Sequence, residues 1–168
     1  DMFFYQQMVN KMHPYVQHIY VVKREDQWID SADKKVTLLT DVPKFKGNGP
    51  LAGIYTAMQE SSAEWFLVLP VDTPLLSTSV IAELMEYMDS GADAIIPRTI
   101  DHIHPLTALY HRQSKELMEG QLLEGKRSLR RLLDKLKVCY ADYTEEAEYF
   151  FANINTREQY NQFINGLE

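Results

Sequence analysis

The sequence predicts an α/β fold in which strands alternate with helices around a largely parallel sheet. Short apolar or β-branched runs, such as residues 18–23 and 36–40, are separated by segments with helical spacing of apolar side chains. The run 64–70 is almost continuously apolar, which is typical of a strand buried on both faces. Two further strand-like runs, 93–97 and 105–110, follow each other without a helix between them, and this predicts one antiparallel strand.

Apolar spacing and capping signals place the remaining elements. Residues 2–12 carry apolar side chains at helical spacing, and the helix is expected to end near Pro14. Pro50 suits the first turn of a helix, and Thr156 with Gln159 forms a capping box. The predicted helices span residues 2–12, 51–61, 79–88, 111–123, 128–136 and 156–164. The predicted strands span residues 18–23, 36–40, 64–70, 93–97, 105–110, 138–143 and 149–154.

Composition restricts the class of protein. The chain has 168 residues, enough for a sizeable core, and we expect a single domain over residues 1–168. The net charge is −7, so the general attraction that nucleic-acid-binding proteins have for phosphate backbones is lacking. No apolar run approaches the roughly 18 residues of a membrane span, and no secretory signal is legible. The single cysteine, Cys139, fits a reducing cytoplasm and is better explained as a core residue than as a reactive thiol.

Ligands of open α/β sheets bind in loops beyond the carboxyl ends of the strands. The first such loop runs from Asp41 through Gly47-Asn-Gly-Pro-Leu-Ala-Gly53 into a helix. Gly49 and Gly53 lie four residues apart, so both flatten one side of the helix start, where free N–H groups attract an anion. The alternative is a flexible loop with a small residue for helix packing, and the local sequence favours neither reading.

A second candidate loop carries Asp72, just beyond the apolar run 64–70. A carboxylate at this edge can hold Mg²⁺, which takes one or two carboxylates together with phosphate oxygens. Pro70 and Pro74 stiffen the loop. This favours a fixed site over the alternative of a turn or helix-capping aspartate.

A third candidate segment contains Asn153 and Asn155. Alternation along the predicted strand puts both side chains on one face, and their amides suit a polar heterocycle or a phosphate. Taken alone, this segment favours the alternative in which Asn155 and Thr156 cap the last helix.

Two weaker signals remain. His102 and His104 share a face if extended, but no third ligand stands at metal spacing, so a zinc site is disfavoured. The basic cluster 125–131 meets an anionic ligand or forms a solvated helix face. Arg127, nearest the glycine turn, is its best functional candidate.

Taken together, these segments resemble the MobA-type molybdenum cofactor guanylyltransferase family over about residues 41–160. The glycine motif alone occurs in other nucleotidyltransferases, whereas the motifs in this order are specific. The matching pieces are Asp41, Gly49-Pro-Leu-Ala-Gly53, the stretch 65–74 ending in Pro70-Val-Asp-Thr-Pro74, His104-Pro-Leu-Thr-Ala-Leu109, Gly125-Lys-Arg127 and Ala152-Asn-Ile-Asn-Thr156.

The resemblance implies a Rossmann-like nucleotidyltransferase fold with three layers, α/β/α, and a mostly parallel mixed sheet. It implies transfer of GMP from GTP to molybdopterin, release of pyrophosphate and Mg²⁺ as cofactor. We expect a monomer whose further partners are molybdopterin-handling proteins and molybdoenzymes. Asp72 matches the catalytic, magnesium-holding aspartate. The nucleotide side comprises Asp41, Gly49, Pro50, Leu51, Gly53 and Asp72. The pterin side comprises Asn153, Asn155, Arg127 and His104.

The family pattern opens with a strand and a glycine-rich phosphate loop, LAGG-x-S-x-RMG-x-x-K, without a counterpart in residues 1–168. A chain limited to these residues is expected to lack the main phosphate cradle and the central strand. Because base choice rests partly on that segment, a cytidylyltransferase acting on the same pterin, or another small-molecule nucleotidyltransferase, stays open. A non-catalytic carrier that holds molybdopterin through Asn153 and Asn155 is the alternative from another class of protein.

Overall fold

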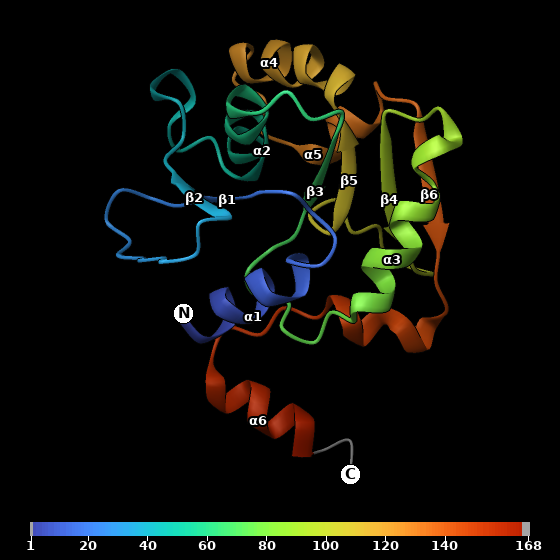
Figure 1. Ribbon diagram of the computed structural model, residues 1–168. Helices are drawn as coiled ribbons and strands as arrows, with labels where there is room; N and C mark the ends of the chain where they lie inside the picture. The colour runs from blue at the N-terminus through green and yellow to red at the C-terminus, as the bar shows by residue number, and fades with distance from the viewer. Residues whose placement is uncertain (1, 166–168) are drawn as a thin grey trace.

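The computed structural model describes residues 2–165 and has an α/β architecture (Figure 1). The helices are α1 (Met2–Met12), α2 (Pro50–Glu60), α3 (Thr78–Glu86), α4 (Lys115–Leu123), α5 (Leu129–Leu133) and α6 (Arg157–Asn165). The strands are β1 (Ile19–Val22), β2 (Val36–Leu39), β3 (Trp65–Val68), β4 (Ala94–Arg98), β5 (Ala108–His111) and β6 (Val138–Asp142).

The described strands lie in two sheets. β1 and β2 pair in parallel, with Ile19 opposite Val36. The second sheet has the order β3-β5-β4-β6, in which β3, β4 and β6 run in one direction and β5 runs in the opposite direction. The predicted mostly parallel mixed sheet is therefore confirmed, and so is the antiparallel strand expected within residues 93–110.

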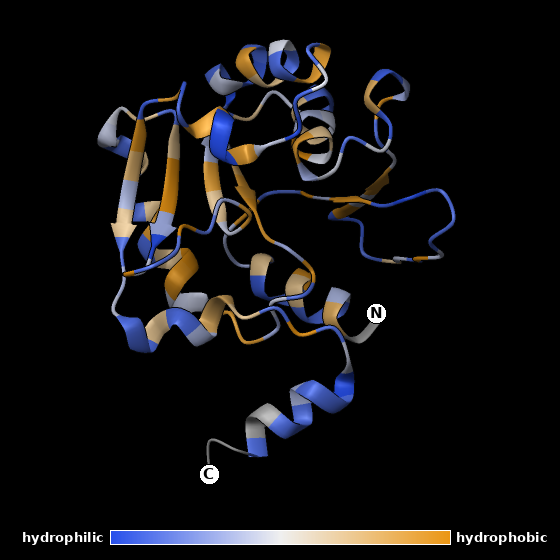
Figure 2. Ribbon diagram, turned by 180° about the vertical axis from the view of Figure 1, so that it is seen from behind, coloured by the Kyte–Doolittle hydropathy of each residue, from blue (hydrophilic) through white to orange (hydrophobic). Residues whose placement is uncertain are grey.

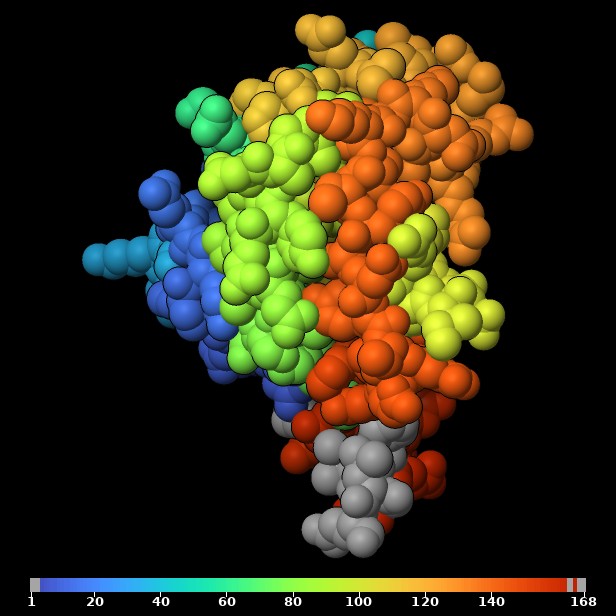
Figure 3. Space-filling view, turned by 90° about the vertical axis from the view of Figure 1, so that its right-hand side faces the viewer, coloured from blue at the N-terminus to red at the C-terminus, as the bar shows by residue number. Residues whose placement is uncertain are grey.

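Helices cover both faces of the four-stranded sheet, which gives the three-layer α/β/α arrangement. Ile96 and Tyr110 face a core that includes α2, α4 and α5. Ile95 and Leu109, one residue earlier in each strand, face a second core that includes α1 and α3. This division follows from the alternation of side chains along a strand. Figure 2 shows the hydrophobic strands between the helical layers, and Figure 3 shows α3 lying against the segment that follows β6.

Helix α1 joins the two sheets. Met8 packs in the core shared with α3 and the four-stranded sheet, whereas Tyr5 and Val9 pack against Ile19 of β1. The amphipathic helix predicted over residues 2–12 is confirmed. Its burial against both sheets gives it a fixed position.

One prediction about strands is wrong, and a second is confirmed only in part. Residues 149–154 do not form a strand: a 3-10 helix spans Glu145–Phe151, and residues 152–155 lie outside any strand. Local hydrogen bonds, such as that from Ala147 N to Thr144 O, satisfy this backbone instead of a ladder. Strand β3 packs against a core on each face, through Phe66 on one and Leu67 on the other, but Phe66 is its one fully buried residue because the strand lies at the edge of its sheet.

Within residues 2–165, the helices lack the combination of length and apolar character that crossing a bilayer requires.

Candidate active site

The loop that follows β3 meets the segment that precedes α6. The backbone N–H of Ile154 donates a hydrogen bond of 2.6 Å to the carbonyl oxygen of Asp72. Asp72 is partly buried, and within the described chain its carboxylate makes no hydrogen bond or ion pair. The main chain of the predicted catalytic aspartate is thus joined to the segment that carries Asn153 and Asn155.

The two asparagines share one depression although they do not lie in a strand. Asn153 and Asn155 lie on either side of Ile154, which is buried. Side chains alternate along this segment even without a neighbouring strand. Asn153 and Asn155 are therefore on the same face, as the sequence predicts, although the predicted strand is absent. The open depression has a volume of about 450 Å³ and is lined by Ala152, Asn153, Ile154, Asn155, Gln159 and Gln162.

The predicted capping box at the start of α6 is confirmed. Gln159 N donates to Thr156 Oγ1 at 3.1 Å, and Gln159 Oε1 accepts from the N–H groups of Thr156 and Asn155 at 3.2 and 3.0 Å. Thr156 and Gln159 therefore supply the side-chain caps. The side-chain amide of Asn155 makes no hydrogen bond in the cap, so the interpretation of this side chain as a helix cap is not supported.

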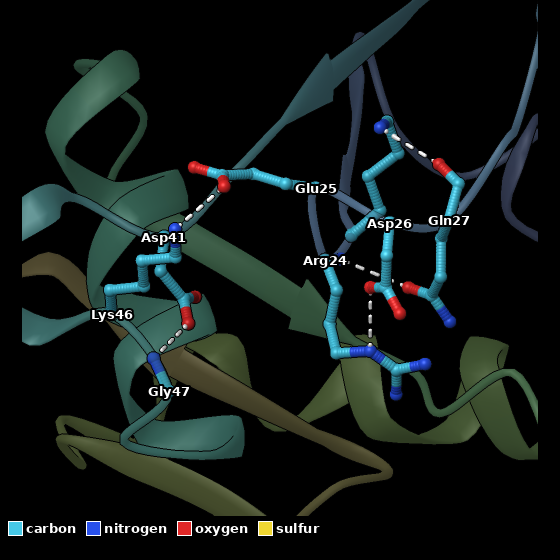
Figure 4. Close-up of polar contacts among 8 residues, drawn as sticks. Arg24, Glu25, Asp26, Gln27, Asp41, Lys46 and Gly47 are labelled. Atoms are coloured by element: carbon cyan, nitrogen blue, oxygen red, sulfur yellow. Dashed lines mark hydrogen bonds and ion pairs between the residues drawn. The ribbon is translucent and has the colours of Figure 1, made fainter.

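A separate set of polar contacts organises the loop before α2 (Figure 4). Asp41 Oδ2 accepts a hydrogen bond of 3.1 Å from Gly47 N and so closes the loop. Lys46 Nζ lies 2.6 Å from Glu25 Oε2, which ties the loop to the turn after β1. Gly49, the N-cap of α2, has a φ of 72°, a conformation that favours glycine. The N-terminus of α2 therefore presents backbone N–H groups from a loop of defined shape.

The two residues after Gly49 differ in what they can offer a nucleotide. Pro50 is exposed at the start of the helix and has no N–H to offer. The Leu51 side chain is fully buried in the core. The side chain of Leu51 anchors α2, so a nucleotide can meet this residue only through its backbone, and its role on the nucleotide side stays a prediction.

The two glycines of this loop should respond differently to alanine. Gly49→Ala forces a Cβ into the left-handed region, and we expect the free energy of unfolding to fall by about 1–3 kcal/mol. At Gly53 the Cβ would meet Val22 at 3.7 Å, an ordinary contact. Because glycine in a helix costs about 1 kcal/mol relative to alanine, Gly53→Ala should be neutral or stabilising. Urea unfolding of both variants checks this, and equal losses would contradict it.

His104 packs against the chain just before Asn153. Its ring stacks on Phe151 with centroids 4.0 Å apart and an interplanar angle of 12°. Glu148 lies 3.6 Å from His104 Nε2 and 3.3 Å from His102 Nδ1. His104 does not line the depression; its contact is with Phe151, two residues before Asn153. A pterin-side role for His104 stays a prediction.

The stacked histidine predicts a pH dependence of stability. Burial lowers the pKa of His104; the Glu148 carboxylate opposes this shift and His102 adds to it. Below about pH 6.5, the usual histidine pKa, the unfolded chain therefore binds more protons at this residue than the folded one. Stability should rise with pH through that window. We expect the free energy of unfolding to fall on acidification below this pH. His104→Gln should flatten that dependence in urea titrations, and an unchanged slope would contradict the assignment.

Residues 2–139 match the sequence model of a family described as the MobA-like NTP transferase domain. The chain belongs to this family. It is 35% identical over 150 residues to a Bacillus cereus (strain B4264) protein named probable molybdenum cofactor guanylyltransferase, covering 88% of this chain and 72% of the relative.

Solved structures share the fold of this MobA-like NTP transferase. Molybdopterin-guanine dinucleotide biosynthesis protein A from Archaeoglobus fulgidus matches with a TM-score of 0.74 and 23% identity, over 98% of this chain and 86% of that one. A 2-C-methyl-D-erythritol 4-phosphate cytidylyltransferase from Thermus thermophilus matches with a TM-score of 0.71 and 11% identity, over 95% and 86%. The fold is the Rossmann-like nucleotidyltransferase fold that the sequence predicts.

The parts of the predicted site are not all in contact. No hydrogen bond or ion pair among the described residues joins the loop 41–53 to Asp72 or to residues 153–155. Arg127 is exposed, and its side chain makes no hydrogen bond or ion pair within residues 2–165. It follows α4, which lies at the opposite end of the four-stranded sheet from α6 (Figure 1). A pterin-side role for Arg127 in this MobA-like NTP transferase stays a prediction.

Sequence analysis of the MobA-like NTP transferase missed two residues at this site. Lys11 Nζ donates a hydrogen bond to the carbonyl oxygen of Pro74, in the Asp72 loop. Glu148 joins His102 and His104, as described above. Lys11 carries no sequence signal because its partner is a backbone group 63 residues away. Glu148 falls just before the segment that was predicted to be a strand.

Proposed function

We propose that this MobA-like NTP transferase is a molybdenum cofactor guanylyltransferase, which transfers GMP from GTP to molybdopterin and releases pyrophosphate. The observation that carries the proposal is the hydrogen bond between Ile154 N and Asp72 O, which joins the main chain of Asp72 to the segment that carries Asn153 and Asn155. The 35% identity to a protein named for this activity supports it. The attacking phosphate is ionised near neutral pH, so the reaction needs alignment and charge compensation rather than a protein base.

Asp72 fits a magnesium ion. No group of three or more His, Cys, Asp or Glu residues able to hold a metal occurs within residues 2–165. Magnesium does not need such a cage, because it is bound through one or two carboxylates together with substrate phosphates and waters. A bound Mg²⁺ would offset the charge of the phosphate groups.

The remaining residues bind and orient the two substrates. The backbone N–H groups at the start of α2, beyond Gly49, suit a phosphate of GTP. The amides of Asn153 and Asn155 donate to and accept from the pterin ring or its phosphate, and Arg127 is a further cation for an anionic group. We propose that the enzyme is a cytoplasmic monomer. The single cysteine and the small soluble substrates support the location.

Nucleotide selectivity tests the proposal. Turnover is compared with GTP and with CTP, in the presence of Mg²⁺ and molybdopterin. We expect a higher kcat/KM for GTP. A preference for CTP would make the protein a cytidylyltransferase. Binding of molybdopterin without turnover of either nucleotide would make it a carrier.

A further inference from the structure

A lysine from the N-terminal helix contacts the loop that carries Asp72. Lys11 lies in the last turn of α1, is partly buried, and donates through Nζ to the carbonyl oxygen of Pro74. Figure 1 shows α1 close to the chain that leads from β3 to α3. Burial lowers the pKa of Lys11, as expected for an ammonium group that has exchanged part of its water for a protein carbonyl.

The contact completes a two-point attachment of the Asp72 loop. The first contact is at Asp72 itself, whose main-chain oxygen accepts a hydrogen bond from Ile154 N. The second contact is at Pro74, two residues after Asp72, where Lys11 Nζ donates a hydrogen bond to the main-chain oxygen. Because the Asp72 side chain makes no hydrogen bond of its own in the described chain, these main-chain contacts fix the backbone from which its carboxylate projects.

The attachment is anchored to a rigid element. Tyr5, Met8 and Val9 of α1 are each 4% exposed and hold the helix against both sheets. A cation in the last turn of a helix is also favoured by the helix dipole. Pro74 is buried, so its carbonyl would be left without a partner if the ammonium group were removed.

We propose that Lys11 is a positioning residue that holds the Asp72 loop in its catalytic arrangement from helix α1. The inference rests on the proposed function, because it takes Asp72 as the carboxylate of nucleotidyl transfer. Lys11 does not touch the reacting atoms. It acts by fixing the main chain two residues from Asp72, and misplacement by about 1 Å is enough to slow a reaction about a hundredfold.

The chain offers a matched control. Lys35 Nζ donates to the carbonyl oxygen of His13, just beyond the end of the same helix, at 2.7 Å. This is also a lysine-to-main-chain hydrogen bond at the end of α1, but its acceptor lies outside the Asp72 loop. Lys35→Met should therefore report the general cost of losing such a bond, and Lys11→Met should report that cost together with the effect on Asp72.

The test measures kcat and KM for GTP in Lys11→Met, Lys11→Arg and Lys35→Met. We expect Lys11→Met to lower kcat about tenfold to a hundredfold with a smaller change in KM. Lys11→Arg should recover most of the rate, and Lys35→Met should leave it unchanged. In an Asp72→Asn background, Lys11→Met should cause no further loss, because both changes act through one carboxylate. Equal rates in Lys11→Met and Lys35→Met, or a full additional loss in the Asp72→Asn background, would overturn the proposal.

A binding measurement separates this inference from the proposed function. Mn²⁺ is titrated as a spectroscopic substitute for Mg²⁺ in the presence of GTP. Weaker Mn²⁺ binding by Lys11→Met than by Lys35→Met is the expected result, and equal binding would contradict it. If the wild-type protein forms no dinucleotide, the guanylyltransferase proposal fails, and the Mn²⁺ titration still decides whether Lys11 positions Asp72.

Discussion

Asp72→Ala should lower guanylyl transfer by about a thousandfold, the scale seen when one preorganised charge-stabilising group is removed from an active site. The substitution removes the carboxylate and leaves the main-chain hydrogen bond from Ile154 in place. Because that carboxylate has no other partner in the described chain, the loss should fall on activity and not on stability. The steady-state rate of pyrophosphate release, measured with GTP and molybdopterin, checks this result.

Asp89→Ala is the matched control, because Asp89 is an exposed aspartate in the 3-10 helix Met88–Ser90, outside the candidate site. It should turn over at the wild-type rate, and both variants should unfold at the wild-type urea concentration. A native rate in Asp72→Ala would remove Asp72 from the reaction. A large loss of stability in Asp72→Ala would show instead that its side chain holds the fold.

The paired substitution Asn153→Ala and Asn155→Ala should raise the KM for molybdopterin about a hundredfold. Each amide supplies a neutral hydrogen bond worth about 1–1.5 kcal/mol, which is close to tenfold in affinity. The two side chains line the same depression, so both contacts are lost from one ligand. The KM for GTP should change little, because no hydrogen bond joins the loop before α2 to this segment in the described structure.

Asn161→Ala serves as the control for this pair, since Asn161 is an exposed asparagine of α6 that does not line the depression. Its kinetics should match those of the wild-type protein. If the paired substitution raised the KM for GTP and not that for molybdopterin, the depression would belong to the nucleotide. Unchanged values for both substrates would remove the asparagines from the site.

The sequence carries the information for those parts of the fold that depend on local pattern. Helix α1 follows from apolar spacing over residues 2–12, and the cap of α6 follows from Thr156 and Gln159. The antiparallel strand β5 follows from two strand-like runs without a helix between them. For α1 and the cap of α6, the deciding contacts join residues within a few positions of one another. For β5, the absence of a crossover helix between the two runs predicts the antiparallel direction.

The parts that could not be predicted depend on contacts between distant segments. The apolar residues of 149–154 have a strand-like composition, but Phe151 stacks on His104 and the Ile154 N–H bonds to Asp72. The Lys11 contact with Pro74 joins segments 63 residues apart through a backbone acceptor, which has no side-chain signature. Motif order pointed to Asp72 and Asn153 as candidate site residues, whereas their juxtaposition required the three-dimensional structure.

The most direct test of the account identifies the product made from GTP. The protein is incubated with GTP, Mg²⁺ and molybdopterin, and the products are analysed by mass spectrometry together with a pyrophosphate assay. The account predicts a molybdopterin guanine dinucleotide and one pyrophosphate for each dinucleotide formed. Release of pyrophosphate without a pterin product, or a dinucleotide formed from CTP in preference to GTP, would contradict it.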